Sequence, residues 1–342
     1  MSHWTKKQRF LAVVSGESAD RVPVSAWRHF IEQEQTATGL AEAMIEFQKQ
    51  YDWDFVKINP RATYYAEAWG NTYDYRQYDG VVPRVNNFVI GNPEDLFSVG
   101  KLPGNQGPFG EQLEVIRTVR KSLGDDVPIL QTLFSPLAVF EYLAGHRTLA
   151  GNREANRCET PLPGFFAASA AGTHQALENI SNTLTDYAKA AIQAGADGFF
   201  YAELGLAREG YLTETEFKEF GRAYDLQLLE ELNQVPIVLH ICGPYAHPER
   251  FYDYPIQAIH WAEHAPGNPS LEESGSWIGD KAVMGGVDEM LFALKDPNKV
   301  FIEANQAIDR MSHRAFLLAP GCGVPLNSTP SALLALRQAV KE

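Results

Sequence analysis

Cysteine is scarce in this chain of 342 residues, and its pattern limits the chemistry available. The three cysteines, Cys158, Cys242 and Cys322, are odd in number and far apart in the sequence. A disulfide framework needs paired cysteines, usually in a small secreted domain, so this pattern favours a reducing compartment. We expect any cysteine with a function here to act as a metal ligand or a nucleophile.

Long apolar runs and excess positive charge are also missing. No stretch approaches the ~18 consecutive apolar residues of a membrane-spanning helix. The 29 lysines and arginines against 43 acidic residues give a formal net charge of −14, which disfavours nucleic acids and anionic membranes as partners. The first residues, MSHWTKKQRF, lack the apolar core of a secretory signal. We therefore expect a soluble, cytoplasmic protein whose partners are small molecules or other proteins.

Short apolar runs recur along the chain and predict the fold. Eight of them read as strands, at 22–27, 53–58, 127–132, 197–202, 235–241, 258–262, 282–287 and 315–320. Helix-like segments separate most of them, such as 213–234, where apolar residues keep a 3.6-residue period and Thr213 or Thr215 can cap the start. The pattern predicts one α/β domain over residues 1–342, a (β/α)₈ TIM barrel. A doubly wound open sheet is the alternative, but no Gly-x-Gly-x-x-Gly turn follows the first strand.

Two segments interrupt this rhythm. Residues 69–92 alternate aromatic and polar side chains around Asp79-Gly80, a strong hairpin signal, so a small β-hairpin is expected after the second strand. Residues 146–166 contain glycine and proline and read as a loop. Cys158 falls in this polar loop, and we expect it to have no functional role.

The sequence VLHICG at 238–243 places two metal-binding side chains at the end of a predicted strand. His240 and Cys242 are two residues apart, so they point to the same face. Cys322, between two glycines, follows the eighth predicted strand, and in a barrel the ends of the fifth and eighth strands open on one mouth. Two thiolates and one imidazole form a three-ligand zinc site with one open position, as in catalytic zinc sites. A packed histidine beside two buried thiols is the alternative.

The fourth ligand is less well defined by the sequence. Glu263 follows the sixth predicted strand and Glu203 ends the fourth, so either carboxylate could complete the site and leave when substrate binds. Solvated carboxylates are the alternative for both. His260 is expected in the core, and His247 and His264 on surface loops.

A zinc site of this composition favours thiol chemistry. A free thiol has a pKa of ~8.5, so little of it is thiolate at neutral pH. Coordination to zinc deprotonates the thiol at neutral pH. The expected reaction is alkylation of a thiol. Hydrolysis by a metal-activated water competes, but two thiolate ligands weaken the Lewis acidity of zinc toward water.

Nearly the whole chain resembles the uroporphyrinogen decarboxylase superfamily of (β/α)₈ barrels. The resemblance rests on several stretches: RVPVSAW (21–27), SPLAVFEYLAG (135–145), AGADGFFYAELG (194–205), VLHICG, GGVDEML (285–291) and APGCGVPLNSTPSALLAL (319–336). The superfamily contains decarboxylases and zinc-dependent methylcobamide:thiol methyltransferases of the coenzyme M type. The methyltransferase branch has His-x-Cys-Gly followed by Gly-Cys, which this chain matches at His240, Cys242, Gly243, Gly321 and Cys322.

The decarboxylase pattern is matched less well. The first strand is followed by WRHFIEQE, with Arg28 but no second arginine close by, and KINPRAT (57–63) offers Asn59 where the decarboxylases have an aspartate. Tyr142 matches a decarboxylase active-site tyrosine. Arg61, Arg84 and Arg208 are the cations that could replace the missing charge, although surface ion pairs are the simpler interpretation.

The resemblance therefore implies a zinc ion that binds an acceptor thiol, whose thiolate attacks the methyl group of a methylcorrinoid on a partner protein. It implies His240, Cys242 and Cys322 as ligands, Glu263 or Glu203 as an exchangeable fourth ligand, and Trp27, Arg28, Asn59 and Tyr142 at the mouth. Homodimerisation is implied by the resemblance alone. Porphyrinogen decarboxylation and non-catalytic binding of a corrinoid or tetrapyrrole remain as alternatives.

Overall fold

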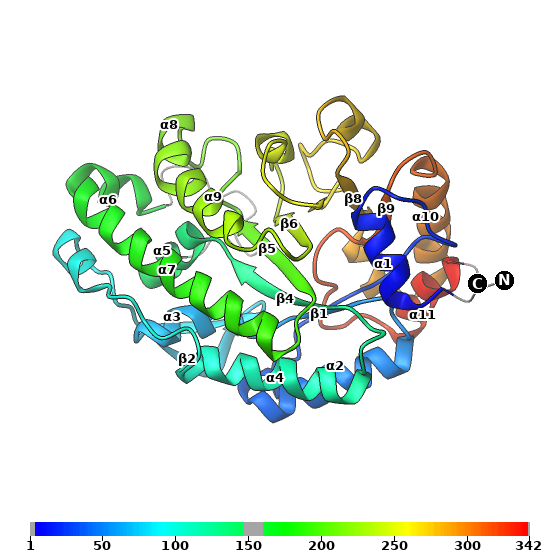
Figure 1. The fold of residues 1–342 in the computed structure, drawn as a ribbon, viewed down its shortest axis with the longest axis horizontal. Helices are drawn as coiled ribbons and strands as arrows, with labels where there is room; N and C mark the ends of the chain where they lie inside the picture. Colours follow the sequence, from blue (N-terminus) through cyan, green and yellow to red (C-terminus); the bar gives the residue numbers. More distant parts are fainter. Residues whose placement is uncertain (1–3, 147–159, 341–342) are drawn as a thin grey trace.

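The computed structural model describes residues 4–146 and 160–340 and shows an α/β fold (Figure 1). Seven parallel strands form one curled sheet in the spatial order β1-β4-β5-β6-β7-β8-β9. The strands are Val56–Ile58 (β1), Ile129–Phe134 (β4), Gly198–Leu204 (β5), Ile237–Ile241 (β6), Ala258–Trp261 (β7), Ala282–Val287 (β8) and Phe316–Pro320 (β9). Seven of the eight predicted strands are therefore present, in the predicted order.

The eighth predicted strand, at 22–27, is reduced to a single bridge. Val24 pairs in parallel with Leu318 of β9. The Leu318 N–H donates to the Pro23 carbonyl at 2.9 Å, and the Asp54 N–H, two residues before β1, donates to the Val24 carbonyl at 2.9 Å. The prediction of a full strand is wrong in extent because Pro23 has no N–H to extend the ladder. The segment nonetheless hydrogen-bonds to both edges of the curled sheet.

The helices pack around the outside of the sheet (Figure 1), apart from the first, which buries Phe10, Val13 and Val14 against side chains of the inner face. They are Lys6–Val14 (α1), Ala37–Tyr51 (α2), Tyr64–Trp69 (α3), Gly107–Leu123 (α4), Pro136–Leu143 (α5), Leu162–Ala168 (α6), Ala170–Ala194 (α7), Glu214–Glu216 (α8), Ala223–Glu230 (α9), Pro297–Arg310 (α10) and Pro330–Ala339 (α11). The helix predicted over 213–234 begins at the predicted cap Thr213, continues through a π-helical turn at Phe217–Arg222, and ends at Glu230. No helix in the described part of the chain is long and apolar enough to span a membrane.

The predicted hairpin is confirmed. Strands β2 (Thr72–Asp79) and β3 (Val82–Asn87) form a separate antiparallel pair after β1. Asp79 pairs with Val82, and the turn between them contains Gly80 at a φ of 62°, a conformation that favours glycine.

The two faces of the curled sheet bury two groups of side chains. The inner group includes Phe55, Leu130, Phe200, Val238 and Met284, and α1 adds Phe10. The outer group lies against the surrounding helices and includes Leu133, Tyr201, Leu239 and Ile259. Because side chains alternate along a strand, the residues that share the face of Val238 at steps of two also point inward. His240 and Cys242 are those residues.

Candidate metal centre

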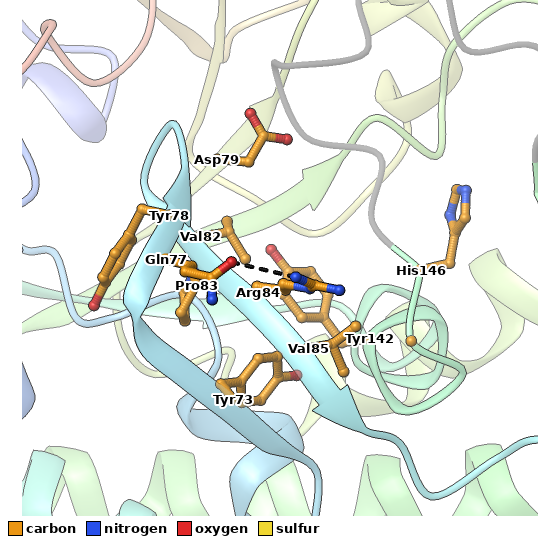
Figure 2. Close-up of a pocket in the computed structure, with 11 residues that line it drawn as sticks. Tyr73, Gln77, Tyr78, Asp79, Val82, Pro83, Arg84, Val85, Tyr142 and His146 are labelled. Atoms are coloured by element: carbon orange, nitrogen blue, oxygen red, sulfur yellow. Dashed lines mark hydrogen bonds between the residues drawn. The ribbon is translucent and has the colours of Figure 1, made fainter.

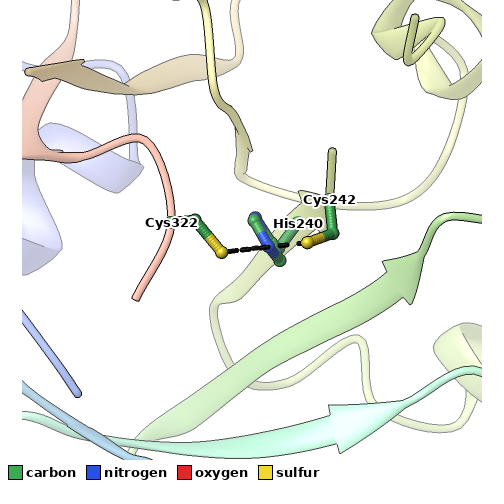
Figure 3. Close-up of side chains that lie close together, drawn as sticks. All are labelled: His240, Cys242 and Cys322. Atoms are coloured by element: carbon green, nitrogen blue, oxygen red, sulfur yellow. Dashed lines mark hydrogen bonds between the residues drawn. The ribbon is translucent and has the colours of Figure 1, made fainter. Parts of the chain in front are cut away.

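The ends of β6 and β9 bring together the three predicted metal-binding side chains (Figure 3). His240 lies in β6 and Cys242 directly follows it, while Cys322 comes two residues after β9. The Cys242 N–H donates to the Leu204 carbonyl at 2.8 Å, beside a register shift in β5 at which Leu204 has a φ of 52°. The irregular end of β5 therefore fixes the backbone of Cys242.

The distances in this group fit a tetrahedral zinc ion. The two sulfur atoms lie 3.8 Å apart, and the Cys322 Sγ is 3.9 Å from the His240 Nε2. All three ligand atoms lie within 4.8 Å of one another. Two Zn–S bonds of ~2.3 Å at a tetrahedral angle separate the sulfurs by about 3.8 Å, so the cysteines fit one ion with little movement. Both are free thiols in the structure.

Electrostatics keep the histidine neutral and make the two thiols unequal. Burial lowers the pKa of His240 well below its ordinary value, so the imidazole has a lone pair for a metal. The hydrogen bond between the thiols lowers the pKa of Cys242 and raises that of Cys322. His260, whose pKa burial lowers to about 3, stacks on His240 at 4.7 Å and lies 2.9 Å from the Pro320 carbonyl through its Nε2. His260 is therefore a buried neighbour of the metal group, as expected for a core residue.

A cavity of about 240 Å³ opens onto the three ligands. Its wall contains the predicted substrate-binding residues Trp27 and Asn59, together with Phe200. Trp27 and Phe200 meet edge to face with ring centroids 5.1 Å apart. The lining thus combines aromatic rings with two thiols, an imidazole, an amide and charged side chains.

The third predicted substrate-binding residue lies outside the cavity lining. The Arg28 guanidinium donates through Nη2 to the Leu326 carbonyl at 2.6 Å, and it packs over the Phe30 ring at 5.8 Å. Burial lowers the pKa of Arg28. Leu326 itself lines the cavity, so Arg28 supports its rim.

Tyr142 lies in a second pocket, of about 320 Å³, between the β2–β3 hairpin and the end of α5 (Figure 2). Arg84, from β3, also lines it and donates to Gln77 across the hairpin at 3.2 Å. Asp79 and Val82 line both this pocket and the metal cavity. The two spaces are therefore neighbours, and Tyr142 is placed toward the outer one.

Glu203 does not belong to the metal group, which corrects its expected role as a ligand. Ala202 pairs with His240 across β5 and β6 and shares its inward face, so the next residue, Glu203, points outward. Burial raises the pKa of Glu203 well above its ordinary value, and the neighbouring Asp225 of α9 raises it further. Asp225 accepts from the hydroxyls of Tyr201 at 2.7 Å and Tyr254 at 2.9 Å.

Glu263 is also engaged elsewhere. Its Oε1 accepts from the Arg310 Nη2 at 3.0 Å, and its Oε2 accepts from the Leu271 N–H at 2.9 Å. Its place as a fourth ligand stays a prediction, and a metal would compete with these two bonds for its oxygens. Cys158 lies outside the described residues.

Lys57 is the residue of this cavity that the sequence reasoning missed. Its side chain is 4% exposed and lines the cavity with the two cysteines. Burial lowers the pKa of Lys57 to about 7, and the charges of Cys322 and Cys242 act in the opposite direction. The signal was its position two residues before Asn59, on the same face of the chain. Glu289, after β8, was missed as well: its charge raises the pKa of both cysteines.

Comparison with known proteins places the chain in a family. The uroporphyrinogen decarboxylase (URO-D) family model matches residues 5–342, so the chain belongs to that family. It is similar to the methylcobamide:CoM methyltransferase MtaA of Methanosarcina barkeri, with 26% identity over 95% of this chain and 94% of the relative. A uroporphyrinogen decarboxylase of Chromohalobacter salexigens is also 26% identical, but over 53% of this chain and 50% of the relative.

A solved methyltransferase structure from Methanosarcina mazei has the same fold. It superposes with a TM-score of 0.80 at 22% sequence identity, covering 98% of both chains. The similarity to methyltransferases thus extends over nearly the full length, whereas the similarity to this decarboxylase covers about half.

Proposed function

We propose that this chain is a zinc-dependent methyltransferase that moves a methyl group from a methylated corrinoid, carried by a partner protein, to a small thiol. The observation that carries the proposal is the group formed by His240, Cys242 and Cys322 at the end of a cavity. Full-length similarity to methylcobamide:CoM methyltransferases supports it. We also infer that the segment around Val24 takes the eighth position of a (β/α)₈ barrel, which makes the cavity the mouth of that barrel.

The residues present fit a zinc ion held by one imidazole and two thiolates. When bound, zinc would keep an incoming thiol in its reactive thiolate form at neutral pH. Three protein ligands leave a fourth position for the acceptor. The buried, neutral His240 supplies a lone pair at the pH where the enzyme works. Trp27 and Phe200 cover one side of the cavity and exclude water from the reacting sulfur.

The transfer itself is balanced between the two substrates. The acceptor loses its thiol proton to solvent, and its sulfur forms a bond to the methyl carbon. The carbon–cobalt bond of the corrinoid breaks at the same time, and its electron pair stays on cobalt. The chain's residues position the sulfur and shield it, while the corrinoid supplies the leaving group.

Decarboxylation of a porphyrinogen is less well supported by the site. A substrate with many carboxylates needs several cations, and two of the three arginines expected to supply them are engaged elsewhere. Arg61 bonds to Glu67 at 2.7 Å and to Glu111 at 2.9 Å. Arg84 bonds to Gln77 in the outer pocket. The third, Arg208, is buried near the metal group, where its charge lowers the pKa of Cys242.

Metal analysis and a methyl-transfer assay test the proposal. We expect about one zinc per chain in the wild type by elemental mass spectrometry, and its loss in Cys322→Ser. Cys158→Ser, which removes the third cysteine of the chain, is the matched control and should retain the zinc. The wild type should then transfer methyl groups from methylcobalamin to thiols. A well-folded, metal-free wild type would refute the proposal.

A further inference from the structure

Lys57 is a buried cation without a carboxylate partner in the described part of the chain. Its Nζ donates to the Asn59 Oδ1. The same nitrogen lies 4.7 Å from the centre of the Phe200 ring and 5.5 Å from that of Trp27. An amide oxygen and two aromatic faces offer only partial negative charge, which does not balance a full positive charge removed from water. Cys322, Cys242 and Glu34 act on Lys57 through their charges, but no carboxylate of the described residues forms an ion pair with its ammonium.

The charges around the ligand group lie on several elements. Thiolates at Cys242 and Cys322 would balance a divalent ion, and His240 is neutral. Beyond these three residues, the charges of Lys57, Arg208 and Glu289 act on Cys242. Lys57 is the cation among the residues that line the cavity and is buried, whereas Asp79 lines it from an exposed position on the hairpin. A bound acceptor thiolate would therefore bring its negative charge into a space that the buried ammonium lines.

We propose that Lys57 is a catalytic residue that serves as the counter-ion of the acceptor sulfur, so that small thiols bind in this cavity as thiolates. This inference rests on the proposed function. Lys57 lines the same cavity as both cysteines, and its ammonium has hydrogens beyond the one given to Asn59. Asn59 is a positioning residue that orients the ammonium. Its own Nδ2 is buried and has no partner in the described structure, so it is a second donor for an anion in the cavity.

The same lysine could instead bind a distal anionic group of the acceptor. Two thiols separate these roles, because 2-mercaptoethanol ionises only at sulfur and 3-mercaptopropionate also has a carboxylate. If Lys57 is the counter-ion of the sulfur, removing its charge should weaken the binding of both thiols equally. If it binds a distal anion, removing its charge should weaken the binding of 3-mercaptopropionate alone.

The test measures thiol binding to the cobalt(II)-substituted protein by its electronic absorption, beside zinc content and methyl transfer. In Lys57→Met we expect full metal content and a dissociation constant raised about 10- to 100-fold for both thiols. Lys57→Arg should recover part of the affinity. Asn59→Asp keeps the lysine but pairs it with a carboxylate, so it should weaken the binding of both thiols in the same way.

Lys101→Met is the control, because Lys101 pairs with Asp186 in an exposed ion pair and does not line the cavity. A loss confined to 3-mercaptopropionate, or unchanged affinity for both thiols in Lys57→Met, would overturn the inference. Loss of metal from Lys57→Met would also overturn it, because Lys57 would then act by stabilising the two cysteine thiolates and not the acceptor. Failure of the wild type to bind metal or transfer methyl groups would refute the proposed function instead. Failure of the inference about Lys57 and failure of the proposed function are therefore distinguishable.

Discussion

The buried carboxyl pair behind β5 gives a prediction about stability. Glu203 is fully buried, and neither of its carboxyl oxygens has a hydrogen-bond partner in the described structure. As a carboxylate it would be a buried charge beside Asp225. Burial raises the pKa of Glu203, and the charge of Asp225 raises it further, which favours a protonated carboxyl that can donate to Asp225.

The free-energy cost of keeping this proton bound determines how much Glu203 lowers the stability of the folded protein. The unfolded chain releases the proton near pH ~4.3, so keeping it bound at pH 7 costs about 4 kcal/mol of folding free energy. A raised folded-state pKa contributes stability at low pH that is lost as the pH rises. Asp225, whose pKa burial raises to about 6, adds to the same loss between about pH 4 and 6. Glutamine in place of Glu203 keeps a donor and needs no proton.

We therefore expect Glu203→Gln to unfold at a higher urea concentration than the wild type at pH 7, with a free energy of unfolding larger by up to about 4 kcal/mol, and to gain little at pH 4. Circular dichroism follows unfolding at both values, and Glu114→Gln, an exposed glutamate, is the control. Zinc content should not change, since Glu203 faces away from the metal group. An equal or lower stability of Glu203→Gln at pH 7 would show that Glu203 is ionised in the folded state and refute the reasoning.

Two further predictions concern the fold and the metal. Asp54, fully buried, accepts from Arg9 at 2.8 Å, Arg21 at 2.6 Å and the Val24 N–H at 2.9 Å. Asp54→Ala leaves two cations without their shared partner and should destabilise the protein by about 3–5 kcal/mol in urea unfolding, and an effect below about 1 kcal/mol would contradict this role. A chelator, or a fall in pH that protonates the ligands, should remove zinc without unfolding the chain, because the three ligands lie on a sheet held by its own core. Loss of the circular dichroism signal on chelation would mean that the metal is structural.

Much of the fold could be predicted because local patterns determine it. Alternation along VLHICG gave the shared face of His240 and Cys242, and the parallel arrangement of strands gave the approach of Cys322. The same alternation, applied across β5 and β6, would have excluded Glu203. The predicted length of the first strand was wrong because Pro23 interrupts its hydrogen-bond ladder.

Other features of the site depend on tertiary contacts that no local pattern reports. The spacing in KINPRAT puts Lys57 on the same face as Asn59, but lysine is rarely buried, so the segment does not indicate that the ammonium lies beside two aromatic rings. The bonds from Arg310 and the Leu271 N–H to Glu263 join residues brought together only by the folded chain. The outer pocket forms where the hairpin meets α5, and neither segment predicts it alone.

The bridge between Val24 and Leu318 has a consequence for the order of assembly during synthesis. Val24 is made near the beginning of translation and Leu318 only after about 300 further residues. The segment around Val24 therefore has no strand to pair with while most of the sheet is synthesised. Cys322 follows the same late strand, and the ligand set is completed at the same moment as the bridge. Under the proposed function, metal loading is therefore a late event in the synthesis of the chain, and a ribosome stalled before β9 holds a polypeptide with two of the three predicted ligands and an unpaired sheet edge.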